Sequence, residues 1–424
     1  MKYIVLMVVS LAFLAGGCGE SSSIYSSLDS SLDNMIGEGD LQVPGLGVIV
    51  FKDGSIVYEH FAGLRNVAKN FTIDRNTRLR VASVSKMFTV FGIMQLVEAG
   101  KIDLDEDISR YLGFELKNPN FPDEKITVRM LASHTSTLRD GESYSLSPGY
   151  SIEEFFKPGG IKYESGGHFA KEDKTFFTYC NLNYGVLGTI IERVSGERFD
   201  VYLKNHVLKP MGINADYVVG NLSSENFRNL GTIYRKENGQ WTAQADSYEE
   251  QPPRDTVLGE SLNGYEIGTN ATAFSPQGGL RISFAELGNC LEMMMNGGNF
   301  RGTKIVREDL FREMCRPQWI YDPAAVNGDP YDVMLIYCLG LYQIDGASEA
   351  RLCEKHDIDL IGHSGEAYGL VSGVYFRPGM KDGVIFMVNG TGVDDERSHG
   401  RFSNSFIWEE EIMNPICEAF FAGK

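Results

Sequence analysis

Two β-hairpin signals near opposite ends of the chain constrain its fold most. The stretch "GLGVIVFKDGSIVYEHFAG" holds two β-rich runs on either side of Lys52-Asp53-Gly54, and "SGVYFRPGMKDGVIFMVNG" holds two more around a Pro-Gly-Met-Lys-Asp-Gly turn. Asp-Gly between apolar runs is a strong hairpin signal. Helical patterns fill the middle of the chain. The sequence therefore predicts an α+β fold, with a mostly antiparallel sheet built from N- and C-terminal segments, flanked by helices, and an inserted, mainly helical subdomain.

The helical patterns have readable boundaries. Helices are expected over about 24–37, from Ser83 to Gly100, from near Thr127, in two pieces separated near Gly196, and in "SFAELGNCLEMMMNGG"; a last helix carries Pro415, which is expected to kink it. Residues 138–175 are rich in Gly, Ser and Tyr and weakly periodic. They predict a long loop of the kind that is often functional.

The first residues predict export. Lys2 precedes an apolar run over 3–15, and Ala15, Gly16 and Gly17 precede Cys18. This resembles a bacterial lipoprotein signal, although Leu14 lies one place too far upstream; the alternative is an ordinary secretory signal that contains a cysteine. We expect a signal peptide at 1–17, a lipidated Cys18 and a polar tether at 18–24. The protein is then an exported lipoprotein of the cell envelope, periplasmic or outer-membrane-associated.

Charge and cysteine content narrow the function classes. With 39 basic and 57 acidic residues, the net charge of −18 argues against binding nucleic acid. The six cysteines other than Cys18 show no C-x-x-C spacing, and the seven histidines form no H-E-x-x-H motif, so we expect no metal and no cofactor. An exported protein could pair some of these cysteines, but the pairing stays open, and buried free thiols are the simpler interpretation.

The stretch "RVASVSKMFTVFGIMQLVEAG" over 80–100 suggests nucleophilic chemistry. Ser83 and Lys86 share a helix face at i and i+3. Burial and the positive helix N-terminus both favour the neutral amine, and a serine hydroxyl needs such a base. The Ser83 N–H at the helix start can also face an oxyanion. Ser85 is adjacent to Lys86 and points elsewhere. Alone this signal is weak, because about one S-x-x-K is expected by chance in a chain of this length.

Two further motifs strengthen it. "FFTYCNLNYG" contains Tyr179-Cys180-Asn181, a Y-x-N, and "LIGHSGEAYG" contains His363-Ser364-Gly365 just before a β-rich run. In this order the motifs resemble those of the penicillin-recognising serine hydrolases, S-x-x-K, Y-x-N and [KH]-[TS]-G. The chain is most similar to the group of class C β-lactamases, D-alanyl-D-alanine carboxypeptidases and related esterases. "LASHTSTL", "LKPMGI" and "SPQGGLRIS" match too.

The resemblance covers about residues 25–420. It implies a β-lactamase/transpeptidase-like serine hydrolase domain over 25–422, with 25–80 and 280–422 in the α/β part and about 100–270 in the helical part. It also implies that Ser83 is the acylated nucleophile and that Lys86 and Tyr179 share proton transfer. The backbone N–H groups of Ser83 and Glu366 are expected to form the oxyanion hole.

The resemblance implies substrate-binding roles as well. Asn181 is expected to bind the substrate's amide carbonyl. His363, with Ser364 and Gly365, is expected to help hold a substrate carboxylate or to assist proton movement. Plainer interpretations remain open: Tyr179 as a core residue, Asn181 as the cap of a helix starting at Leu182, and His363 as structural. His134 is interpreted as a structural element at a helix end.

Two departures from the family pattern bear on function. Thr137 stands where glycine is usual in "SHTSG", which predicts a different local backbone. His363 replaces the lysine typical of class C β-lactamases, and a neutral imidazole holds a carboxylate less firmly than an ammonium does. This argues against an efficient β-lactamase. We expect hydrolysis of peptide, amide or ester bonds, with D-amino-acid cell-wall peptides as candidate substrates.

Rival interpretations are a true class C-type β-lactamase and a non-catalytic, penicillin-binding-like sensor or binding module. A third is an α/β-hydrolase whose nucleophile is Ser364 in "GHSGE". In that motif Glu366 replaces the final glycine, and the segment leads into a β-rich run rather than a helix. The sequence leaves the oligomeric state open.

Overall fold

The structure is a computed structural model that describes residues 18–164, 167–172, 176–329, 333–392 and 398–422. The expected signal peptide at 1–17 lies outside these residues. Within them, no helix combines the length and apolar character needed to cross a membrane.

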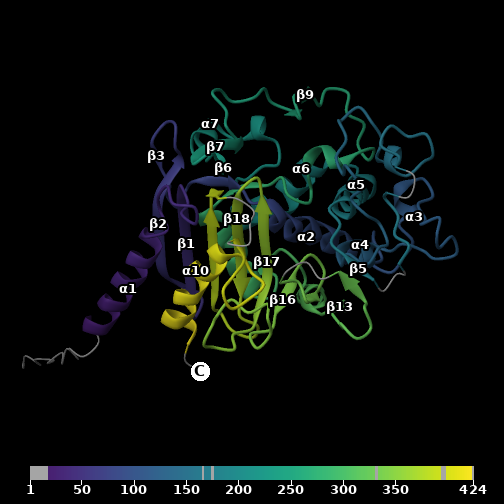
Figure 1. Cartoon of the computed structure of the whole chain (residues 1–424). Coiled ribbons are helices and arrows are strands. Elements are labelled where there is room, and N and C mark those ends of the chain that lie inside the picture. Colours follow the sequence, from purple (N-terminus) through teal and green to yellow (C-terminus); the bar gives the residue numbers. More distant parts are fainter. Residues whose placement is uncertain (1–17, 165–166, 173–175, 330–332, 393–397, 423–424) are drawn as a thin grey trace, which may run out of the picture.

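One antiparallel sheet of nine strands joins the two ends of the chain (Figure 1). Its strand order is β13-β15-β16-β17-β18-β19-β1-β2-β3. The N-terminal and C-terminal strands meet at the pair β1 and β19, where Leu46 lies opposite Val388. The N-terminal strands are β1 (Gly45–Lys52), β2 (Ser55–Asn66) and β3 (Phe71–Thr72); the C-terminal strands are β13 (Trp319–Ile320), β15 (Ile336–Tyr337), β16 (Tyr342–Ile344), β17 (Leu360–Ala367), β18 (Leu370–Phe376) and β19 (Gly383–Val388). The predicted α+β architecture is confirmed.

Both hairpin turns lie where the sequence places them. Asp53 and Gly54 join β1 to β2 with φ of 52° and 79°, the positive values that a tight two-residue turn requires. The Pro-Gly-Met-Lys-Asp-Gly turn joins β18 to β19.

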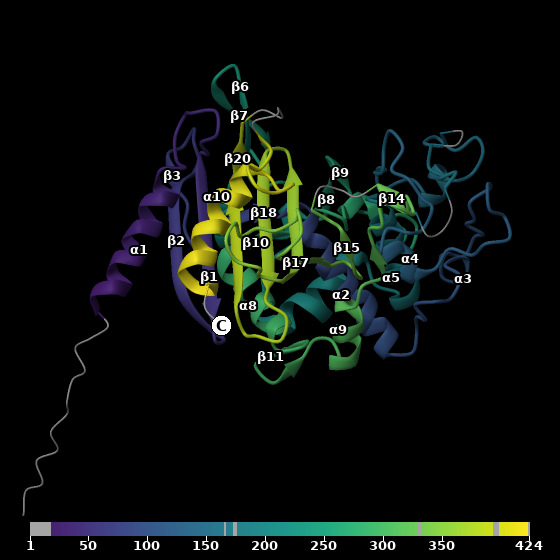
Figure 2. The same ribbon diagram turned by 60° about the horizontal axis from the view of Figure 1, so that its bottom comes forward.

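Helices cover both faces of the sheet. Alternate side chains of β1 point to opposite faces, so Ile49 belongs to one hydrophobic core and Val48 and Val50 to the other. The Ile49 core also holds α2 (Ser85–Glu98) and α8 (Phe284–Met295). The other core holds α1 (Cys18–Asp33), α10 (Ile407–Ile416) and the π-helical turn η8 (Cys417–Phe421). Figure 2 shows α1 and α10 on the near face of the strands.

The helical part packs against α2. It contains α3 (Ser109–Leu112), α4 (Val128–Ala132), α5 (Leu182–Ser195), α6 (Phe199–Tyr202) and α7 (Ser224–Arg228), with short 3-10 and π turns between them. The side chain of Thr127 accepts a hydrogen bond from the Met130 N–H and caps α4 where a helix start is predicted. Gly196, with φ of 76°, ends α5 at the predicted break. The hairpin β6 (Ile233–Glu237) and β7 (Gln240–Ala245) was not predicted; it joins the short β20 (Gly390–Thr391).

The N-terminal helix differs from expectation. The structure has α1 running from Cys18 to Asp33, so the tether expected at 18–24 is helical, and the helix expected to reach residue 37 ends earlier. Leu28 and Leu32 are buried, and Tyr25 stacks on Tyr58. These contacts fix the C-terminal half of α1. Extending a helix that is already nucleated costs little, so the serine-rich segment before it becomes helical.

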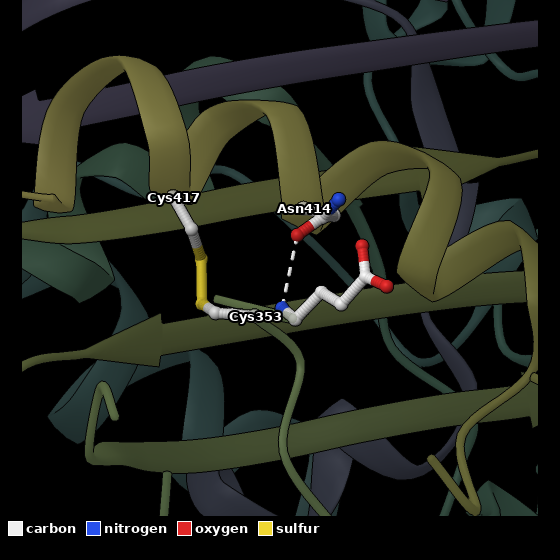
Figure 3. The surroundings of a disulfide bond; sticks show 4 residues. Cys353, Asn414 and Cys417 are labelled. Atoms are coloured by element: carbon white, nitrogen blue, oxygen red, sulfur yellow. Dashed lines mark hydrogen bonds between the residues drawn. A yellow bond between two sulfur atoms is a disulfide. The ribbon is translucent and has the colours of Figure 1, made fainter. Parts of the chain in front are cut away.

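The C-terminal helix is tied to the loop that precedes β17. Cys353 and Cys417 form a disulfide, and the Asn414 side chain accepts a 2.9 Å hydrogen bond from the Glu354 N–H (Figure 3). Pro415 lies in the last turn of α10, and the chain continues as the π-helical turn η8. Among the cysteines whose side chains the structure describes, four are free thiols: Cys180, Cys290, Cys315 and Cys338. The free-thiol interpretation therefore holds for four cysteines and fails for one pair.

Candidate active site

Ser83 lies on a strained turn between strand and helix. β4 (Arg78–Arg80) leads into the 3-10 turn η1 (Ala82–Val84), and α2 begins only at Ser85, so the predicted start of the helix at Ser83 is wrong by two residues. Ala82 has φ of 46°, in the left-handed region that residues with a side chain rarely occupy. The turn leaves Ser83 half-buried at the wall of a cavity of about 500 Å³, while its chain neighbours are buried. Ser85 points elsewhere, and its hydroxyl accepts from the Leu280 N–H.

Lys86 is fully buried and contacts Ser83. Its Nζ lies 2.9 Å from Ser83 Oγ, 2.9 Å from Asn181 Oδ1 and 3.1 Å from the carbonyl oxygen of Gln277. Two of these partners can only accept hydrogen bonds. A neutral amine has two N–H groups and one lone pair. Donating to Asn181 and Gln277 leaves the lone pair facing the Ser83 hydroxyl, the arrangement that a general base requires.

Burial makes that neutral amine accessible near neutral pH. Desolvation lowers the pKa of Lys86 to about 7, and it outweighs the opposing charge of Asp140. The aromatic rings of Tyr179 and Tyr184 lie 4.6 and 5.2 Å from Nζ at their centroids. Such contacts favour the ammonium form. The site can therefore hold either protonation state of Lys86.

Tyr179 reaches the cavity from the segment between β5 (Phe177–Thr178) and α5. It lines the cavity together with Ser83 and Asn181, so the structure brings the first two motifs together. Its ring face is turned toward the Lys86 amine.

Asn181 does not cap α5. Its side chain makes no capping hydrogen bond, because Oδ1 accepts from Lys86 and Nδ2 donates to Asp140 Oδ2 at 2.9 Å. Asp140 Oδ1 instead accepts from the Leu182 N–H at 2.8 Å. Asp140 thereby fixes the Asn181 amide so that its oxygen faces Lys86. Asp140 is not among the residues predicted from the sequence, although it directly follows the "LASHTSTLR" stretch.

The third motif passes close to the Ser83 turn, and Gly365 makes this possible. A β-carbon at position 365 would lie 2.4 Å from the Val81 carbonyl oxygen and 3.2 Å from the Ser83 nitrogen. The Gly365 carbonyl accepts a hydrogen bond from Ser372 on β18. In a trans peptide, the N–H of the next residue points the opposite way. The Glu366 N–H therefore points away from β18, at an edge of β17 that β16 leaves uncovered beyond Gly362.

His363 is not in the cavity wall. Ser364, Glu366 and Ala367 line the cavity, whereas the His363 side chain is fully buried behind β17. Burial, with Lys86 nearby, lowers the pKa of His363 to about 3, so the ring is neutral. The expected contact of His363 with a substrate carboxylate is therefore not supported.

The two buried histidines share one tyrosine. His134 Nε2 and His363 Nε2 each lie 3.1 Å from Tyr337 Oη. The Cys180 N–H donates to His134 Nδ1, and His363 Nδ1 lies 2.5 Å from the Ser364 carbonyl oxygen. The two backbone partners determine the tautomer of each ring. His134 accepts at Nδ1, so its Nε2–H donates to Tyr337 Oη; the Tyr337 hydroxyl donates to His363 Nε2; and His363 Nδ1–H donates to the Ser364 carbonyl.

This relay connects the segment of the second motif to the strand of the third. The contacts of His134 fit the structural interpretation. Its partners, Tyr337 and the Cys180 N–H, lie in other segments and not at the end of α4. Burial also lowers the pKa of His134 well below its usual value. Thr137 has φ of 64°, the left-handed conformation that glycine favours, so this residue adopts the backbone shape despite its side chain.

Comparisons with known proteins bear on the family and the fold of the chain. Residues 32–404 match the family model described as Beta-lactamase. Protein flp of Staphylococcus aureus strain N315 is 28% identical over 186 residues, and penicillin-binding protein 4* of Bacillus subtilis strain 168 is 29% identical over 175 residues. These matches span 42% and 39% of this chain and 36% of each relative, so the chain spans about a third of the length of the curated relatives it matches.

Among solved structures, the D-amino acid amidase of Ochrobactrum anthropi SV3 complexed with D-phenylalanine superposes with a TM-score of 0.67 at 18% identity. The superposition covers 95% of this chain and 100% of the amidase. At this identity the likeness shows a shared fold.

Replacing Tyr337 by phenylalanine tests the relay. Tyr337→Phe leaves one buried nitrogen of each histidine without its partner, so we expect the free energy of unfolding to fall by about 1–3 kcal/mol. Urea denaturation at pH 7 measures this, and Tyr321→Phe, on a partly buried tyrosine, is the control. Equal stability of Tyr337→Phe and the wild type would contradict the relay.

Proposed function

Because this chain belongs to the Beta-lactamase family, we propose that it is an exported serine hydrolase acting through an acyl-enzyme on peptide, amide or ester bonds. One observation carries the proposal: the fully buried Lys86 amine lies 2.9 Å from Ser83 Oγ, with its other two partners restricted to accepting hydrogen bonds.

The geometry supports the following reaction. Ser83 Oγ attacks the substrate carbonyl carbon, and its proton passes to Lys86 Nζ. The oxygen of the tetrahedral intermediate accepts hydrogen bonds from the backbone N–H groups of Ser83 and Glu366. As the bond to the leaving group breaks, that group takes a proton from the Lys86–Tyr179 pair, and the acyl group stays on Ser83. Water then attacks the ester, gives a proton to the same pair, and releases the acid product and the serine.

Amide substrates of D-configuration are the proposed class. The solved structure that shares the fold is named a D-amino acid amidase, and one curated relative is named penicillin-binding protein 4*. These names support substrates such as cell-wall peptides for this chain. A true class C-type β-lactamase is the second candidate, because the family carries that name. Against it, His363 is buried and neutral where an ammonium is typical.

A non-catalytic sensor is the candidate of another class. It would need no serine that can be acylated, and Ser83, Lys86 and Tyr179 are all present at the cavity.

Labelling of Ser83 tests the proposed function. A fluorophosphonate and a fluorescent penicillin should both label the wild-type protein. Ser83→Ala should abolish labelling, because the nucleophile is gone, whereas Ser364→Ala should keep it. Gel fluorescence and mass spectrometry of the labelled peptide measure the outcome. Labelling that survives in Ser83→Ala and disappears in Ser364→Ala would support the rival nucleophile, and no labelling of the wild type would favour the sensor.

The pKa of Lys86 predicts a pH profile. The neutral amine is the competent base, and its fraction rises as pH passes upward through a pKa of about 7. The fluorophosphonate labelling rate should therefore increase from pH 5 to pH 8, be half-maximal near pH 7, and then level off. Lys86→Arg should show almost no labelling at any of these pH values, because a guanidinium does not deprotonate. A rate independent of pH would exclude Lys86 as the base.

Export and lipid anchoring are part of the proposal. The N-terminal pattern supports them, and so does the Cys353–Cys417 disulfide, because disulfides persist in oxidising compartments.

We expect expression in a bacterial host to give a membrane-associated protein that incorporates labelled palmitate. Cys18→Ser should lose the label and become soluble after export, because it lacks the acceptor thiol. Cell fractionation measures the membrane association, and palmitate labelling measures the lipidation. Export without palmitate incorporation by the wild type would indicate an ordinary secretory signal, and retention in the cytoplasm would contradict export altogether.

A further inference from the structure

Arg80 differs from the other arginines of its small sheet. β4 pairs with β10 (Arg281–Ser283), and this pair carries Arg78, Arg80 and Arg281. Arg78 forms two hydrogen bonds with Glu286, and Arg281 forms two with Asp246. Arg80 donates its Nε–H to the Gly278 carbonyl at 2.9 Å, and its terminal nitrogens have no hydrogen-bond or ion-pair partner among the described residues.

The surroundings of Arg80 compensate its charge only in part, because the Asp246 carboxylate that attracts it is already hydrogen-bonded to Arg281. It lies directly opposite Arg281 in the strand pair, and its guanidinium stacks 5.1 Å from the centre of the Tyr368 ring. Burial and the charge of Arg281 both lower the pKa of Arg80, yet a guanidinium stays charged at neutral pH. A half-buried cation next to another cation is unfavourable unless an anion joins it.

Arg80 faces the same cavity as the nucleophile. It lines the cavity of about 500 Å³ that holds Ser83, three residues further along the chain. It also lines a neighbouring hollow of about 930 Å³, and Tyr368 borders both spaces.

The other basic side chains in or beside this cavity already have partners or carry no charge. Arg235 pairs with Glu366 at 3.2 Å, Lys86 is hydrogen-bonded to Ser83, and His363 is buried and neutral. An anionic group of a substrate therefore finds Arg80 as the cation whose terminal N–H groups are still available.

We propose that Arg80 is the anion anchor of the active site, binding a carboxylate that the substrate carries near the scissile bond. This rests on the proposed function and adds a specificity: carboxylate substrates are preferred over otherwise identical neutral ones. A planar guanidinium suits this role, because it can donate two parallel hydrogen bonds to one carboxylate. The carboxylate belongs either to the leaving residue, as at a free peptide C-terminus, or to the acyl part.

Two matched substrate pairs test the anchor and separate these sources. N-acetyl-D-Ala-D-Ala and its C-terminal carboxamide differ in charge on the leaving residue; the p-nitrophenyl monoester of glutaric acid and p-nitrophenyl valerate differ in charge on the acyl part. In Arg80→Gln, kcat/KM for the charged member of one pair should fall about tenfold to a hundredfold, with its neutral partner within about twofold. Arg80→Lys should recover part of the loss, because it keeps the charge.

Arg235→Gln is the matched control. It removes a cation from the same cavity, but one already neutralised by Glu366, so the charged-to-neutral ratio should not change in either pair. Thermal melting verifies that each variant is folded. A fall of equal size for charged and neutral substrates in Arg80→Gln, or no fall, overturns the anchor.

Failure of the proposed function has a different signature. If the wild type hydrolyses neither pair and fluorophosphonate does not label Ser83, the hydrolase itself is rejected, and the anchor with it. If labelling occurs without turnover, the same four compounds are used to slow labelling. Protection by charged compounds that is stronger than by neutral ones, and that is lost in Arg80→Gln, supports the anchor; equal protection overturns it.

Discussion

The proposed chemistry of this molecule depends on a fully buried amine, that of Lys86. An ammonium in the interior is disfavoured because desolvation costs more than nearby charges return, and this lowers the pKa of Lys86 to about 7. A buried neutral lysine could not act as a base if another partner donated a hydrogen bond to its lone pair. Asn181 and Gln277 present oxygens only, so the remaining direction belongs to Ser83. Asp140 enforces this choice by binding the Asn181 amide nitrogen.

The fold brings these groups together from distant segments. The strained turn at Ala82 lifts Ser83 toward the cavity, α5 begins beside Asn181, and β17 supplies the edge that carries Glu366. Close approach is possible because Gly365 has no side chain to meet the Val81 carbonyl. A larger residue at 365 would push the strand away from the nucleophile and separate the two expected oxyanion donors. The sheet that joins the chain ends is thus part of the proposed catalytic geometry as well as the scaffold.

Local patterns predicted the elements, and long-range packing decided what the side chains do. The Asp53-Gly54 turn and the Ser83–Lys86 spacing depend on neighbours in the chain and are readable from it. Whether the His363 side chain reaches the cavity depends on how distant segments pack around β17, and a single motif does not reveal that packing. The alternative that Asn181 caps α5 stayed open, because a sequence cannot show that Asp140, forty-one positions away, accepts from the Leu182 N–H instead.

Burying His363 changes what the third motif can contribute. A lysine at that position is typical of class C β-lactamases, whereas burial and the nearby Lys86 keep this ring neutral, and its contacts with Tyr337 and Ser364 hold it beside the strand that lines the cavity. Under the proposed anchor, the motif keeps its place in the fold while the carboxylate-binding role expected of it belongs to another residue. Arg80 is suited to take that role, because it approaches the same cavity from the strand that leads to the nucleophile and has no carboxylate of its own among the described residues.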